Sequence, residues 1–206
     1  MARAEIFGKS SARMKFTYAV GATPIDPDEA AGLIPSHIAT QSELNIWEEA
    51  NILQGAAWAQ RQKKRELLDE GFVRELHKRM FNRTWRWAGT FRASNKNIGV
   101  DWAHVSVRLN NLLANTQYQI SHAIFTADEL AVRFHHQLVW IHPFPNGNGR
   151  HARLLADTLA VRLGRKRFSW GANSSSTVSE LRQQYLQALR SADTGEYEQL
   201  IEFARC

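Results

Sequence analysis

The chain has 206 residues, of which 44% are hydrophobic, and its formal net charge is +6. This length and composition predict one globular domain with a substantial core, and the basic balance favours phosphate-bearing partners such as a nucleotide, a nucleic acid or an acidic protein without choosing among them. The one cysteine, Cys206, excludes an internal disulfide, and the sequence lacks a membrane-length apolar run and a secretory signal, so we expect a cytoplasmic protein without a membrane partner.

The first predicted element is a polar arm over residues 1–36, interrupted by several prolines. Thr40 and Glu43 then fit a capping box, which predicts the start of a long helix at about residues 41–68. The apolar residues that we expect on its buried face recur at helical spacing: Ile46, Ala50, Leu53 and Ala57. Gly71 is expected to break this helix, and a second helix runs to about Asn82.

Residues 90–100 carry turn residues between short apolar pieces, and this is the one stretch where we expect extended structure. Further helices are predicted at about residues 105–121 and 127–141. Another helix follows a glycine-rich turn and ends at Gly164, and the last two lie at about residues 177–192 and 195–205. The fold class predicted from these patterns is mainly α.

The most informative segment is residues 142–150, His-Pro-Phe-Pro-Asn-Gly-Asn-Gly-Arg, with a further arginine at Arg153. A glycine-rich turn at a helix N-terminus presents unpaired N–H groups and partial positive charge, which together favour an anion such as phosphate. Arg150 and Arg153 are three residues apart and share one helix face, whereas Leu155, Leu159 and Leu163 fall on the opposite face. The segment therefore predicts an anion site on one side of a helix and a core on the other.

This string resembles the signature of the Fic/Doc family, His-x-Phe-x-Asp/Glu-Gly-Asn-Gly-Arg-x-x-Arg. The positions that match in register are His142, Phe144, Gly147, Asn148, Gly149, Arg150 and Arg153. Asn146 departs from the pattern, because most members have an acid there. The whole-chain layout is also similar to the Fic-containing family called mobile mystery protein B, whose name records an association with mobile genetic elements. The resemblance implies a Fic-fold helical bundle over residues 37–206 with a short β-hairpin flap.

The resemblance implies a protein adenylyltransferase, which moves AMP from ATP to a Ser, Thr or Tyr hydroxyl of a protein target. The candidate general base is His142, because an imidazole with a pKa of about 6.5 can accept a hydroxyl proton at neutral pH. The expected phosphate-binding residues are Gly147, Asn148, Gly149, Arg150 and Arg153, with Arg150 and Asn148 also assigned to the catalytic set. The flap would be formed by Lys96, Asn97, Ile98 and Gly99, against which the target peptide pairs as an added strand.

Asn146 stands where the family's acid binds the magnesium ion that bridges the nucleotide phosphates. Magnesium prefers anionic oxygen ligands, so a neutral amide at this position would hold it more weakly. One interpretation is that phosphates and water supply enough ligands and AMP transfer persists. Others are that the chain uses another phosphate-bearing donor, or is a non-catalytic nucleotide- or DNA-binding protein on the Fic fold. Retention of His142 argues against a pure binding protein.

The first long helix also suggests autoinhibition. Many Fic proteins carry the motif Ser/Thr-x-x-x-Glu-Gly/Asn, whose glutamate pairs with the second signature arginine and occupies the space of the γ-phosphate. Residues 45–51 resemble this motif, with Glu49 at the glutamate position, so we expect a Glu49–Arg153 pair. In some members the same glutamate helps to remove AMP, which leaves a de-AMPylating hydrolase as an alternative. The sequence leaves the oligomeric state open, a homo-oligomer included.

Overall fold

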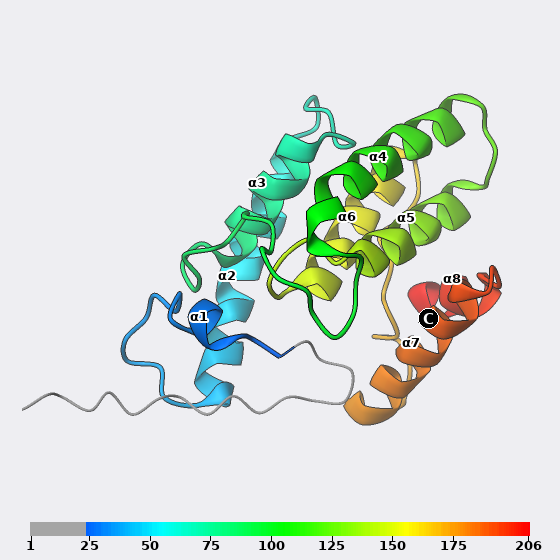
Figure 1. Ribbon diagram of the computed structural model, residues 1–206. Coiled ribbons are helices and arrows are strands. Elements are labelled where there is room, and N and C mark those ends of the chain that lie inside the picture. The colour runs from blue at the N-terminus through cyan, green and yellow to red at the C-terminus, as the bar shows by residue number, and fades with distance from the viewer. Residues whose placement is uncertain (1–23) are drawn as a thin grey trace, which may run out of the picture.

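The computed structural model describes residues 24–206, and this part of the chain is mainly helical, as predicted (Figure 1). The elements, in chain order, are α1 (Pro27–Ala30), α2 (Gln41–Arg61), α3 (Glu70–Phe81), the 3-10 helix η1 (Trp102–His104), α4 (Val105–Ser121), α5 (Ala127–Ile141), α6 (Asn148–Arg162), α7 (Val178–Asp193) and α8 (Glu198–Arg205). The bounds predicted for the helices at residues 105–121 and 127–141 are confirmed.

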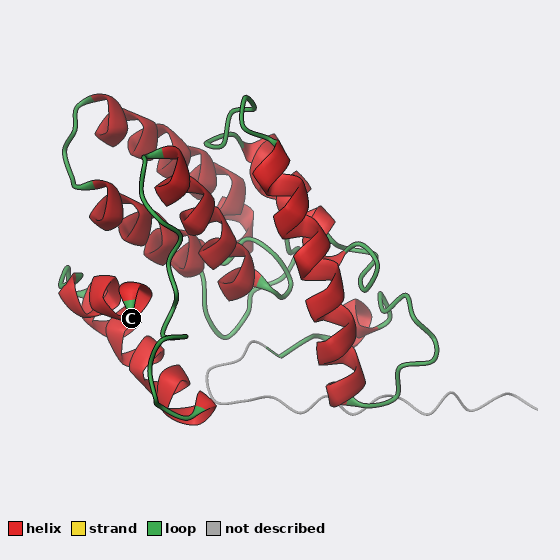
Figure 2. Ribbon diagram, turned by 180° about the vertical axis from the view of Figure 1, so that it is seen from behind, coloured by secondary structure: helices red, strands yellow, loops and turns green. Residues whose placement is uncertain are grey.

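The helices form three groups around a common core. Helix α5 packs between α4 and α6, α2 packs along α3, and α7 pairs with α8, which in turn contacts α5 (Figures 1 and 2). Helices α2 and α3 both contact α6, so the N-terminus of α6 lies where the groups meet. Large side chains from α3, α5 and α6 are fully buried there, among them Phe72, Phe81, Phe134 and Leu155.

The buried face of α2 is not the one that the apolar residues predicted. Ile46 and Leu53 are 67% and 65% exposed, and the helix is buried instead along Leu44, Glu48, Asn51, Gly55 and Ala59. Two polar residues on this face have packing partners that the sequence pattern does not reveal. Asn51, for example, donates to the carbonyl of Arg79 (3.1 Å) and accepts from the amide of Arg83 (2.9 Å). It thereby provides hydrogen-bond partners for backbone groups at the C-terminal end of α3.

Hydrogen bonds mark both ends of α2. The predicted capping box is confirmed: Thr40 Oγ1 accepts from the Glu43 amide (3.2 Å), and the Glu43 carboxylate accepts from the Thr40 amide (3.0 Å). The helix ends at Arg61, earlier than predicted, where Gln62 leaves the helical conformation (φ −87°, ψ 42°). Beyond this end, Arg162 of α6 binds the carbonyls of residues 62 and 65. The next helix has its own cap, Asp69, which accepts from the Phe72 amide (3.0 Å).

Residues 92–100 form an irregular loop between α3 and η1, so the prediction of extended structure there is wrong. In the described residues, the β-type pairing is a single antiparallel bridge between Leu33 and Trp85. This bridge belongs to the N-terminal segment, which is docked along residues 84–86: the Ile34 amide donates to the Thr84 carbonyl (2.9 Å). The described chain contains no helix that is both long and apolar enough to cross a bilayer.

Candidate active site

An anion-binding geometry is built at the start of α6. Gly147 has a left-handed backbone (φ 78°) and lies against Phe81, where a Cβ would come within 2.6 Å of the ring. The first hydrogen bond into the helix is donated by the His151 amide to the Gly147 carbonyl (3.0 Å), so the amides of residues 148–150 lie outside the helical ladder. A Cβ on Gly149 would meet no atom within 4 Å, which leaves room for a ligand in front of these amides.

Asn148 holds the loop closed rather than pointing into this space. Its Oδ1 accepts from the Phe144 amide (2.9 Å) and its Nδ2 donates to the Phe144 carbonyl (2.8 Å). Phe144 is fully buried and anchors the loop in the core. The role predicted for Asn148, donation to a phosphate, is therefore corrected to a brace across the loop.

His77 is a residue of the site that the sequence did not reveal. Its Nδ1 accepts from the Gly89 amide (3.0 Å), so its Nε2 carries the proton and donates to the carbonyl of Asn146 (3.0 Å). Complete burial lowers the pKa of His77 well below its usual value, which keeps this neutral tautomer. The ring also stacks on Phe144 at 3.7 Å between centroids. His77 lies far from the motif in sequence, and no local pattern marks it.

The two signature arginines have different surroundings. Arg150 Nη1 lies 2.7 Å from Glu48 Oε2, and the second oxygen of Glu48 accepts from Trp85 Nε1 (2.7 Å). The expected Glu49–Arg153 pair is wrong: Glu49 is exposed and forms no ion pair in the described part of the chain, whereas Glu48 is only 5% exposed. One residue along a helix is about 100° around its axis, so only one of two adjacent glutamates can face α6.

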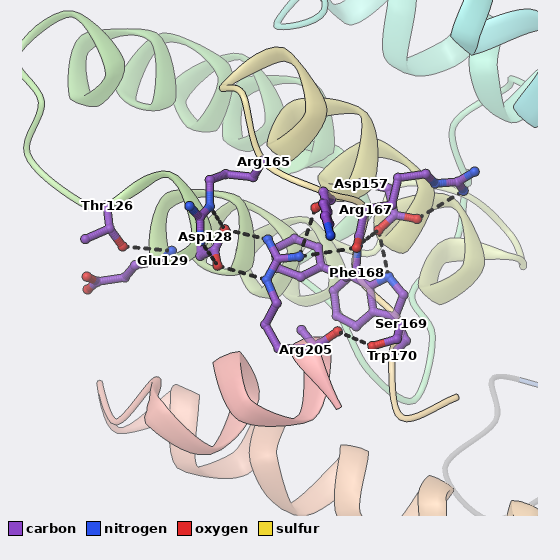
Figure 3. Close-up of polar contacts among 12 residues, drawn as sticks. Thr126, Asp128, Glu129, Asp157, Arg165, Arg167, Phe168, Ser169, Trp170 and Arg205 are labelled. Carbon is purple, nitrogen blue, oxygen red and sulfur yellow. Dashed lines mark hydrogen bonds and ion pairs between the residues drawn. The ribbon is translucent and has the colours of Figure 1, made fainter. Parts of the chain in front are cut away.

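Arg153 rests on aromatic rings. Its guanidinium lies 4.4 Å from the Tyr185 ring centroid and 5.8 Å from that of Trp170, and its buried Nε has no hydrogen-bond partner among residues 24–206. Asp157 holds Trp170 in place by accepting from its Nε1 (3.0 Å), and Arg167 donates to the other oxygen of Asp157 (3.2 Å; Figure 3). Among residues 24–206, the arginine is therefore held by these rings and no carboxylate forms an ion pair with it.

His142 lies at the junction of α5 and the anion loop. It ends α5 in a left-handed conformation (φ 54°, ψ 60°), and its carbonyl accepts from Arg92 Nε (2.7 Å). Burial lowers the pKa of His142 to about 4, and the positive charges of Arg92 and Lys96 add to this effect. The imidazole is consequently neutral at pH 7, and the same burial makes it a weaker base than an exposed histidine.

Comparison with known proteins identifies this arrangement. The model of the Fic/DOC family matches residues 67–160, which include α3, α4, α5 and most of α6. These residues form a Fic domain.

The relatives of this Fic domain differ in how much of their length it covers. "Protein adenylyltransferase Fic" of Nematostella vectensis is 44% identical over 55 residues, which are 27% of this chain and only 12% of that protein. A Fic-domain signaling protein of Bacteroides thetaiotaomicron superposes with a TM-score of 0.60 at 22% identity, over 78% of this chain and 66% of that one. BepC of Bartonella tribocorum, solved with bound AMPPNP, superposes at 0.64 and 15% identity, over 82% and 87%. Both superpositions show that this chain shares the fold of these two proteins.

The predicted flap, taken with its flanking residues as residues 94–100, lies against His142. Gly99 has φ 100°, and a Cβ there would come within 2.7 Å of the His142 Cβ. Arg92 binds both ends of the flap, through the carbonyls of Ser94 (2.9 Å) and Val100. Of the predicted flap residues, Asn97, Ile98 and Gly99 are exposed. The side chain of Lys96 is buried, with only 2% of it exposed.

The described residues do not fit a magnesium site of their own. Asn146 Oδ1 accepts from the Gly147 amide (2.7 Å), and it is a neutral oxygen in any case. No group of three or more His, Cys, Asp or Glu side chains within residues 24–206 could hold a metal ion. Since magnesium prefers anionic oxygens, the magnesium implied by the resemblance would depend on ligands other than the described residues.

Proposed function

We propose that this Fic domain transfers AMP from ATP to a side-chain hydroxyl of a protein target, and that Glu48 restrains the reaction. The observation that carries the proposal is the position of a neutral, buried imidazole at one end of a short loop whose other end is an open helix N-terminus. This arrangement supports a base for a hydroxyl beside a cradle for phosphates.

In the proposed reaction, the hydroxyl oxygen of the target attacks the α-phosphorus of ATP and forms a new P–O bond. His142 takes the hydroxyl proton, and the bond from the α-phosphorus to the bridging oxygen breaks, so pyrophosphate leaves with that electron pair. The amides at the start of α6 stabilise the charge on the phosphates, and Arg153 supplies a cation nearby. No step is assigned to a metal.

Restraint by Glu48 is supported by the ion pair with Arg150. A guanidinium bound to a carboxylate at 2.7 Å has fewer donors to offer to a phosphate. The second oxygen of Glu48 is fixed by Trp85, so the carboxylate cannot turn aside freely. Arg150 is 40% exposed, which leaves one side of it accessible to a ligand that competes for it.

A donor other than ATP is the second candidate, and the observation that favours it is Asn146, which supplies no anionic ligand for the magnesium of a nucleoside triphosphate. A panel of α-labelled nucleoside triphosphates addresses both candidates. The first candidate predicts that ATP labels the protein best, and equal or better labelling from another donor would favour the second.

The experiment that tests the reaction compares ATP labelled at the α-phosphate with ATP labelled at the γ-phosphate. Transfer of AMP predicts that Glu48→Gln acquires the α-label and not the γ-label, and that adding His142→Ala abolishes labelling. Transfer of the γ-label would indicate phosphorylation instead. Release of AMP from previously labelled protein, faster in wild type than in Glu48→Gln, would favour the hydrolase.

A further inference from the structure

A flap lysine is bound by two carboxylates from the N-terminal segment. Lys96 Nζ lies 2.6 Å from Asp26 Oδ2 and 2.6 and 2.7 Å from the two carboxylate oxygens of Glu29. Ser94, also in the flap, donates to Asp26 Oδ2 (3.1 Å). The Lys96 side chain is only 2% exposed, so its charge depends on these partners rather than on water. In agreement, the hydrogen bond from Lys96 is the main effect that lowers the pKa of Asp26.

The carboxylates are themselves attached to the core. Asp26 caps α1 in a reciprocal pair with Glu29, whose carboxylate accepts from the Asp26 amide (3.1 Å). The carbonyl of Glu29 accepts from Trp87 Nε1 (3.0 Å), and the Trp87 ring stacks on Trp85 with 5.0 Å between centroids. Trp85 is also the residue that fixes Glu48. The attachment of the flap and the restraint on Arg150 therefore meet at one tryptophan pair.

The flap has a second attachment, which lies inside the Fic domain. Arg92 binds carbonyls at both ends of the flap and the carbonyl of His142, so it fixes the ends of the loop. Its Nη2 also lies beside Gly99, where a Cβ would come within 3.0 Å of it, and Gly99 in turn lies against His142. Lys96 lies in the same loop, and its partners come from outside the segment that matches the family.

We propose that Asp26 and Glu29, acting through Lys96, are positioning residues that set where residues 97–99 lie relative to His142. That this position presents a target hydroxyl to His142 rests on the proposed function. The attachment itself does not, because it can be measured without turnover.

These contacts predict by how much the flap is displaced in three variants. Asp26→Asn with Glu29→Gln removes both negative charges and leaves a buried ammonium unpaired, so Lys96 must move into water and take the flap with it. Lys96→Met removes the buried charge and keeps an apolar stem, while the Asp26 side chain, 48% exposed, is readily hydrated. Lys96→Arg keeps the charge. Displacement of the flap should therefore be largest in the double carboxamide variant, smaller in Lys96→Met and smallest in Lys96→Arg.

The test is amide hydrogen exchange across residues 94–100 in the full chain, with Asp28→Asn as the matched control. Asp28 is a neighbouring carboxylate that is exposed and forms no ion pair in the part of the chain that the structure describes. We expect about tenfold faster exchange in the flap of the double variant, with α5, α6 and the Asp28→Asn protein unchanged. An unchanged flap, an equal effect of Asp28→Asn, or faster exchange throughout α5 and α6 would each overturn the proposal.

Activity provides an independent readout. In the Glu48→Gln background, the double carboxamide variant should lower labelling from ATP while leaving the Kd for ATP within about twofold, and Lys96→Arg should retain labelling. If no variant labels, the proposed function fails while the exchange result stands. If labelling occurs and flap exchange is unchanged, the positioning role fails alone.

Discussion

Replacing Glu48 by glutamine should increase the affinity for ATP. The substitution removes the negative charge that binds Arg150, while the amide oxygen of glutamine can still accept from Trp85 Nε1, so no buried donor is left unsatisfied. Arg150 is then free to turn toward a phosphate. Because Glu49 is exposed, the matched change Glu49→Gln removes the same charge from the same helix without touching Arg150.

The size of the effect follows from the contact. A hydrogen bond between ionised groups contributes about 1.5–3 kcal/mol, and the 40% exposure of Arg150 favours the lower end, since water screens that side of the pair. Freeing the arginine should therefore contribute about 1.5 kcal/mol to ATP binding, or roughly a tenfold decrease in Kd.

Isothermal titration of ATP into wild type, Glu48→Gln and Glu49→Gln measures this effect directly. We expect a decrease in Kd for Glu48→Gln alone. If the two variants bind alike, or if Glu48→Gln binds no more tightly than wild type, the restraint by Glu48 is refuted.

Three further predictions follow from the loop and the core. Gly149→Ala should leave the free energy of unfolding unchanged or slightly higher, because the added Cβ would meet no atom within 4 Å. It should weaken ATP binding about tenfold, because the methyl group fills the space before α6, and unchanged ATP binding would contradict the anion site. Asn146→Asp should make labelling from ATP more dependent on magnesium, and a titration with the same midpoint as wild type would contradict it. Burial lowers the pKa of both His135 and His151 to about 3. Their contribution to the free energy of unfolding is therefore complete above about pH 6.5 and is lost as the pH falls. Urea unfolding at pH 7 and at pH 5 should show a loss of about 2 kcal/mol for each histidine, and a free energy of unfolding that does not change with pH would contradict this prediction.

The sequence predicted what depends on short-range chemistry. The bounds of α4 and α5 and the capping box of α2 all follow from spacing or caps. The glycine-rich turn before a helix is likewise found where the motif predicted it, at Gly147 and the start of α6.

The errors arose where a distant partner decides the outcome. The face of α2 was predicted from Ile46 and Leu53, but helix packing buries a polar face whose Glu48 and Asn51 find partners in α6 and at the end of α3. A hydrophobic pattern cannot identify a buried face that is partly polar. The same limit hid His77 and the attachment of Lys96 to Asp26, which are contacts between residues far apart in the chain.

We propose that His142 and the anion loop together transfer AMP. This is tested most simply by the intact mass of the Glu48→Gln protein after incubation with ATP, with Glu48→Gln/His142→Ala as the control. AMP transfer predicts a species heavier by one AMP, attached to a Ser, Thr or Tyr hydroxyl, and its loss in the control. No added mass, or the same added mass without His142, would contradict it.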